Sequence, residues 1–148
     1  MELLDIFIFM QQHHKKGAYM IKIKNGEASA FNSQAIADLF SNDARQFPVD
    51  DAFRLLDMID GIQKRLEIYH KTVKKIIDDH QGKVDGKGRI TYPNMENQKS
   101  AHQKIITLNE IEIEIAGERI SPNDQWPKLT LTEAAILRPL LKNGHETV

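Results

Sequence analysis

The feature that most constrains the fold is a regular run of apolar residues between positions 52 and 76. Eight of them follow one another at alternating spacings of three and four: Ala52, Leu55, Ile59, Ile62, Leu66, Tyr69, Val73 and Ile76. This spacing is a heptad seam along one face of an α-helix. Pro48 and the acidic pair Asp50 and Asp51 mark its start, because negative charge in a first turn suits the helix dipole. We therefore expect a helix over residues 50–80, roughly 45 Å long at 1.5 Å per residue.

The two halves of this helix differ in the width of their apolar stripe. Phe53, Leu56 and Met58 widen it in the first half, which predicts that this half packs within the domain. The second half keeps to the seam, and basic residues flank it: Lys64, Arg65, Lys71, Lys74 and Lys75. We expect that half to form a stalk with one partner helix. Gly61 lies off the seam and predicts a bend or the close approach of another element.

The expected partner is a helix that begins at about Glu96 and places Ala101, Ile105 and Leu108 on one face. Residues 82–94 connect the two helices and contain two turn signals beside a strand-like stretch, which predicts an exposed hairpin or loop at the tip of the stalk. The two helices together predict an antiparallel αα-hairpin. Because the seam is longer than this partner can cover, its remainder faces the sheet, the first helix or a second copy, and a homodimer is possible.

Two short segments, residues 21–24 and 111–115, alternate apolar and charged residues as a half-buried strand does. Their charged positions have opposite signs, with Lys22 and Lys24 in the first and Glu112 and Glu114 in the second. Pairing the segments would set these charges across the solvent face of a sheet, at about 0.2 to 1 kcal/mol per pair. We expect the apolar face, with Ile111, Ile113 and Ile115, to cover the thick end of the helices.

Local signals complete the predicted element order. Asn25-Gly26 predicts a turn after the first strand, and Asn32 or Ser33 caps a short helix that ends near Ser41. Thr130 and Glu133 form a capping box before a last short helix, which Pro139 ends or kinks. The fold class is α+β: a long helical hairpin of coiled-coil type, packed at one end on a two- to three-stranded antiparallel sheet, with a short C-terminal helix.

The predicted fold occupies residues 20–141 as a single domain, followed by a flexible tail over residues 142–148. The first strand begins only after Met20, so residues 1–19 are expected to be a dispensable extension. Codons for residues 15–20 can contain an AAGGAG ribosome-binding sequence just before Met20. We therefore expect translation to start at Met20.

Composition and motifs argue against several kinds of chemistry. The chain has no cysteine, which excludes disulfides, cysteine-ligated zinc and thiol catalysis, and its formal net charge of -1 weakens a case for nucleic acid. No esterase elbow, zinc-protease motif or phosphate loop occurs, so no catalytic residue, cofactor or metal is expected. His13-His14 and Asp78-Asp79-His80 lack further ligands at suitable spacing, and a solvated helix end explains the second group better.

We expect the protein in the cytoplasm and not in a membrane. The opening stretch "MELLDIFIFM" has acids where a secretory signal needs positive charge, and it is too short to span a bilayer.

Surface residues in three places are candidates for binding a protein partner. Trp126 is either a lid on the core, which we favour, or an exposed contact of the kind enriched in interfaces. The tip of the stalk contributes Asp85, Lys87, Arg89 and Tyr92, and the acidic face of the last strand contributes Glu112 and Glu114.

The order of these features resembles a family of small proteins from phages and prophages of Gram-positive bacteria, known as domain of unknown function 1617. The similarity runs from the strand start at Met20 through the helix entry at residues 47–55, the tip at residues 85–88 and the strand at residues 110–115 to the ending at residues 129–141. Residues 79–82 depart from the family's usual "KYGE". The resemblance implies a phage origin and supplies no catalytic residues.

These observations favour a non-enzymatic phage protein that acts through protein–protein contacts, as an accessory factor or chaperone in virion assembly or as a host-interaction factor. The alternative is an inhibitor of a host defence system, such as an anti-CRISPR protein, whose acidic groups imitate phosphates. A third class, nucleic-acid binding through the lysine side of the long helix, is less favoured because acids are interleaved with the lysines. An enzyme is the least favoured.

Overall fold

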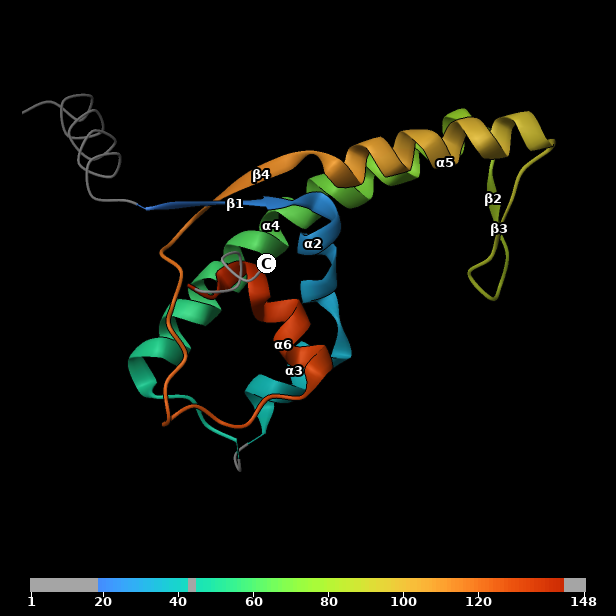
Figure 1. The fold of residues 1–148 in the computed structure, drawn as a ribbon. Coiled ribbons are helices and arrows are strands. Elements are labelled where there is room, and N and C mark those ends of the chain that lie inside the picture. The colour runs from blue at the N-terminus through green and yellow to red at the C-terminus, as the bar shows by residue number, and fades with distance from the viewer. Residues whose placement is uncertain (1–18, 43–44, 143–148) are drawn as a thin grey trace, which may run out of the picture.

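One long helix, α4 (Val49–Asp79), organises the protein, and the other elements are arranged around it (Figure 1). The computed structural model describes residues 19–42 and 45–142. Before α4 come β1 (Met20–Lys24), α2 (Asn25–Ser29), the 3₁₀ turn η1 (Ala30–Asn32) and α3 (Gln34–Ser41). After it come β2 (Lys83–Val84), β3 (Ile90–Thr91), α5 (Met95–Glu110), β4 (Glu112–Ala116), α6 (Leu131–Leu137) and η2 (Arg138–Leu140). The mixed helix and sheet fold is as predicted. Residues 1–18 of the predicted extension, with His13 and His14, and residues 143–148 of the predicted tail lie outside the described residues.

The seam on α4 is buried in its first half, where the sheet and the N-terminal helices cover it. Leu55, Ile59, Ile62 and Leu66 are buried there, together with Met58. These side chains meet β4, α2 and η1, which contact the helix directly. The sheet and the first helices therefore cover the part of the seam that α5 does not reach.

Two predictions about α4 need correction or sharpening. Phe53 and Leu56 were expected to pack within the domain, yet they are 65% and 43% exposed. A helix turns only part of its circumference toward one core, and the seam together with Met58 already fills that arc. At Gly61 the helix continues, and a β-carbon added there would lie 3.4 Å from Cγ2 of Ile115. Ile115 of β4 thus lies close to α4 at this glycine, at a distance that an alanine would also allow.

The main sheet pairs β1 with β4 in the antiparallel register that the charges predict. Lys22 lies opposite Glu114 and Lys24 opposite Glu112. The ion pair that forms, however, joins Nζ of Lys24 to Oε2 of Glu110 at 2.8 Å, and this hydrogen bond raises the pKa of Lys24. Opposite charge thus favours the register, although the close contact involves Glu110, the last residue of α5.

Corrections also apply at the ends of these strands. Ile111 was expected on the buried face, but it precedes β4 and is half exposed. Asn25-Gly26 begins helix α2 instead of a turn. The backbone N–H of Asn25 donates to the carbonyl of Ile111 at 2.9 Å, and its side-chain amide donates to the carbonyl of Leu108 at 3.1 Å. These bonds hold Asn25 against the end of α5, so the chain continues into α2. Strand β1 therefore pairs with β4, which lies far along the sequence.

Helix α5 lies beside the second half of α4, and the short β2–β3 hairpin projects from the far end of the pair (Figure 1). Ala101 is buried, and the hydroxyl of Tyr69 donates to Oδ1 of Asn109 at 2.6 Å. Nε2 of His80 lies 2.9 Å from the hydroxyl oxygen of Ser100. Coiled-coil packing of the two helices stays a prediction.

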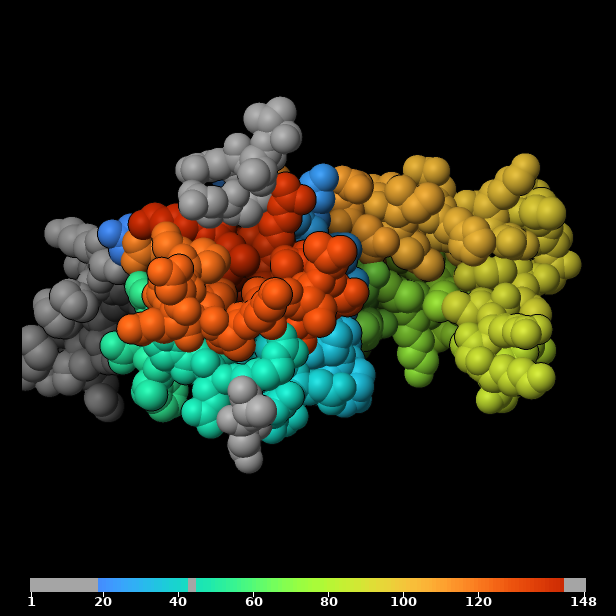
Figure 2. All heavy atoms as spheres, turned by 60° about the horizontal axis from the view of Figure 1, so that its bottom comes forward, coloured from blue at the N-terminus to red at the C-terminus, as the bar shows by residue number. Residues whose placement is uncertain are grey.

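The core lies between α4, the sheet, the N-terminal helices and the C-terminal segment. Figure 2 shows the chain after β4 lying against α3 and the first half of α4, while α5 and the hairpin extend away. Both predicted caps are present, since Ser33 accepts from the N–H of Ile36 and Thr130 accepts from that of Glu133. Helix α6 ends at Leu137, two residues before Pro139, which lies buried in η2, and Leu140 packs into the core.

Candidate functional site

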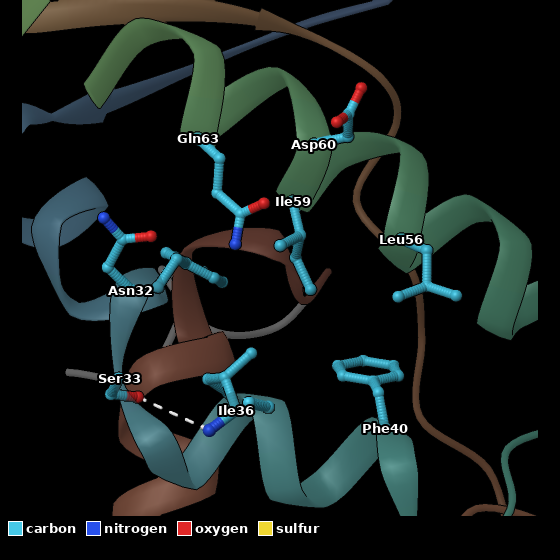
Figure 3. A pocket seen from close by; sticks show the side chains of 10 residues that line it. Asn32, Ser33, Ile36, Phe40, Leu56, Ile59, Asp60 and Gln63 are labelled. Carbon is cyan, nitrogen blue, oxygen red and sulfur yellow. Dashed lines mark hydrogen bonds between the residues drawn. The ribbon is translucent and has the colours of Figure 1, made fainter. Parts of the chain in front are cut away.

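A hollow of about 510 Å³ lies between α3 and α4. In Figure 3, Phe40 of α3 and Leu56 of α4 point toward each other near one end, while Asn32 and Gln63 point toward each other at the other. Ile36 and Ile59 form part of the floor between these two ends. The walls are therefore apolar along most of their length and carry amides at one end.

A second hollow of about 280 Å³ shares Phe40 and Leu56 with the first. It continues toward the start of α4, where Val49 and Phe53 line it together with Arg45. Because the two hollows have these side chains in common, we treat them as one feature, the α3–α4 groove.

An exposed apolar stripe follows the groove along α4. Val49, Phe53 and Leu56 are spaced four and three residues apart, so they share one face of the helix. Val49 is 69% exposed, Phe53 is 65% exposed and Leu56 is 43% exposed. Contiguous apolar surface of this kind is typical of interaction sites. The apolar character of Phe53 and Leu56 predicted an interior position for both, whereas their exposure depends on where α3 lies, which no local pattern encodes.

Acidic side chains border the stripe on its outer side. Asp50 and Asp57 lie three residues before and four residues after Phe53, and both are exposed. Asp60 lines the groove, and its Oδ2 lies 3.1 Å from Nζ of Lys64. Together with Arg54, which lies between Asp50 and Asp57, this part of α4 therefore carries three carboxylates and two cations.

The arginines near the groove are engaged by carboxylates. Both terminal nitrogens of Arg45 donate to Glu133, at 2.7 Å and 2.6 Å, and Nη2 of Arg54 lies 3.4 Å from Oε2 of Glu118. The hydrogen bond from Arg45, together with the bonds from Thr130, lowers the pKa of Glu133 to about 2 against the opposing effect of burial. The pair is thus ionised on both sides at neutral pH and adds no net charge to the groove.

Trp126, one of the predicted partner-binding residues, packs on the core as the favoured reading expects. Its ring meets that of Phe47 edge to face with centroids 4.9 Å apart, and its indole N–H donates to Oδ2 of Asp51 at 2.8 Å. It is half buried near the start of α4. A role in binding stays a prediction.

The predicted tip residues lie at the opposite end of α4 from Trp126. The carboxylate of Asp85 accepts from the backbone N–H groups of Lys87 and Arg89, at 2.8 Å and 2.9 Å, and so holds the turn of the hairpin. Tyr92 is half buried and meets the ring of His102 edge to face. The structure therefore gives Asp85 and Tyr92 structural contacts, and it brings Asp85, Lys87 and Arg89 together in one turn while Tyr92 packs on α5.

Glu112 and Glu114 lie on the exposed face of β4, as predicted, opposite lysines of β1. Asp78 and Asp79 are exposed at the end of α4. The ring of His80 is engaged on both sides, with Nδ1 2.7 Å from the carbonyl oxygen of Ile76. Across residues 19–42 and 45–142, no three histidine or carboxylate side chains are grouped in a way that could hold a metal ion.

No helix in the described part of the chain is long and apolar enough to cross a membrane. No protein-family model, curated protein or solved structure matches the chain. The resemblance to the phage family therefore stays a prediction that rests on the motifs given above.

Proposed function

We propose that this chain is a non-enzymatic protein-binding module of a phage, and that its partner docks in the α3–α4 groove. The observation that carries the proposal is the exposed stripe of Val49, Phe53 and Leu56 beside an apolar groove. The phage origin, with a role in virion assembly or toward the host, rests on the resemblance alone.

The energetics of the stripe suit a reversible contact. Covering each of the three side chains would contribute about 1 to 2 kcal/mol, because they are only partly exposed at present. Their sum is about as large as the free energy lost with translational and rotational freedom on binding, so the stripe alone would not hold a partner. Contacts along the rest of the groove must supply the binding free energy of about -8 kcal/mol that corresponds to a micromolar dissociation constant.

The groove is also a better candidate than other exposed apolar side chains. Ile68 is 62% exposed on the same helix, but it lines neither of the two hollows. Single apolar residues of this kind are normal on a protein surface. Ile68 therefore provides a control that matches Phe53 in helix and in exposure.

The test compares three forms of the full chain as bait in cells that carry the phage: the natural sequence, Phe53→Asp and Ile68→Asp. Circular dichroism first establishes that the variants keep their helix content, as expected for exposed positions. We expect the natural chain and Ile68→Asp to retain the same protein, and Phe53→Asp to lose it. Equal retention by all three forms would overturn the assignment to the groove.

A further inference from the structure

We propose that the α3–α4 groove receives an amphipathic helix whose apolar face is flanked by lysine or arginine. This inference rests on the proposed function and specifies the chemistry of the partner. Three observations carry it: the nature of the groove walls, the spacing of the stripe and the charge along its border.

The walls indicate a helix because most of their length is itself helical. Between α3 and α4 the backbone N–H and C=O groups bond along the helix axes, and only the end toward residues 45–47 is formed by a loop. An extended peptide buried there would leave its own backbone groups unpaired, whereas a helix satisfies them internally. Extended partners instead bind at sheet edges, where main-chain bonds are available.

The stripe sets the length and anchor spacing of the occupant. From Val49 to Gln63 the groove follows α4 for roughly 21 Å, the length of a helix of about 14 residues. Phe40 on α3 and Leu56 on α4 face each other within it (Figure 3). Apolar side chains of the occupant, spaced four and three residues apart, would fit between them, and the amides of Asn32 and Gln63 would meet a polar end.

The charges along the border select the flanks. Asp50 and Asp57 lie beside Phe53 on the outer side of the stripe, where Arg54 between them pairs with Glu118, and Asp60 lines the groove next to Lys64. Arg45 is held by Glu133. The α3 residues that line the groove, among them Ile36, Ala37 and Phe40, carry no charge. Basic residues beside the anchors would thus meet carboxylates, while acidic ones would be repelled.

The experiment uses three synthetic helical peptides of about 14 residues. All share a scaffold: one has apolar anchors with lysine flanks, one has the same anchors with glutamate flanks, and one has lysine flanks with alanine in place of the anchors. Binding to the full chain is measured by fluorescence polarisation at low and high salt. We expect the lysine-flanked peptide to bind about tenfold more tightly than the glutamate-flanked one, with the difference shrinking as salt rises. The alanine peptide should not bind.

Two variants connect the binding to the named residues. Asp57→Lys combined with Asp60→Lys should reverse the preference between the lysine and glutamate flanks, and Phe53→Asp should abolish binding of both peptides. Ile68→Asp should change neither affinity. Equal affinities for the two flanks, or a preference that the charge reversal leaves unchanged, would overturn the inference while the groove remains a binding site.

The outcomes also separate this inference from the proposed function. If Phe53→Asp loses a cellular partner but no peptide binds, the helical occupant is wrong and the proposed function stands. If Phe53→Asp still retains the cellular partner and no peptide binds, the helical occupant and the proposed function are both wrong. Light scattering decides a further case, because a dimer that Phe53→Asp dissociates would identify a second copy as the occupant and overturn the basic-helix proposal.

Discussion

Arg45 and Glu133, 88 positions apart in the sequence, form a two-point ion pair that joins the segment before α4 to the start of α6. Oε1 of Glu133 also accepts from the backbone N–H of Thr130 at 2.8 Å, and Arg45 donates to the carbonyl of Lys128. One carboxylate therefore caps α6 and anchors a distant loop at the same time. The side chain of Glu133 is only 7% exposed, which sets this pair apart from the other ion pairs of the described chain.

Replacing this carboxylate should destabilise the fold more than replacing an exposed one. Glu133→Gln removes the charge from a buried pair and leaves Arg45 without its partner, so we expect the melting temperature to fall by about 5 °C or more. Glu118→Gln is the matched control, because Glu118 pairs with Arg54 at 3.4 Å with both side chains largely exposed. Its melting temperature should stay close to that of the natural chain. Equal losses in the two variants would show that the pair with Arg45 has no special role.

The same pair predicts a dependence of stability on pH. The pKa of Glu133 falls from its ordinary value of 4.5 to about 2 because Arg45 stabilises the carboxylate in the folded state. A depressed folded pKa adds stability that is present above pH 4.5 and is lost as the pH falls toward 2. Thermal unfolding across this range should show the gap between the natural chain and Glu133→Gln to be widest near neutral pH and to narrow with acid. A gap that stays constant with pH would contradict this cause.

Regular patterns in the sequence predicted the parts of the fold that depend on them. The seam located α4 to within a residue or so at each end, and the alternating lysines and glutamates predicted that β1 pairs with β4. Periodicity states which face of an element is apolar, and opposite charges choose between registers. The capping box at Thr130 was equally local and was also confirmed.

The candidate site was not predicted because it depends on the relative placement of α3 and α4. Phe53 and Leu56 have the composition of core residues, and only the packed structure shows that the core-facing arc of α4 lies elsewhere. Arg45 carries no periodic signal at all, since it lies in a loop and meets Glu133 through tertiary structure. The turn predicted at Asn25-Gly26 does not form, because Asn25 makes hydrogen bonds with residues more than eighty positions away in the sequence.

Trp126 should stabilise the fold through its indole nitrogen as well as its ring. Trp126→Phe keeps an aromatic ring beside Phe47 but loses the hydrogen bond to Asp51, so we expect the free energy of unfolding to fall by about 1 kcal/mol. Denaturant unfolding followed by circular dichroism measures it. The control is Tyr19→Phe, since Tyr19 is largely exposed and should change stability by less than about 0.5 kcal/mol. An unchanged midpoint for Trp126→Phe would remove the hydrogen bond from the account of the core.

Gly117 closes β4 where the backbone and a core side chain leave no room for a β-carbon. Its φ is +148°, and an added β-carbon would lie 2.5 Å from Cγ and 2.7 Å from Sδ of buried Met58. Gly117→Ala should therefore lower the free energy of unfolding by about 1 to 3 kcal/mol, whereas Gly86→Ala, which meets nothing within 4 Å, should have little effect. Denaturant midpoints measure both. Combining Gly117→Ala with Met58→Ala separates the two causes, because the clash disappears and only the backbone strain remains. If Gly117→Ala costs as much in the Met58→Ala background as in the natural chain, the contact with Met58 is not what requires glycine here.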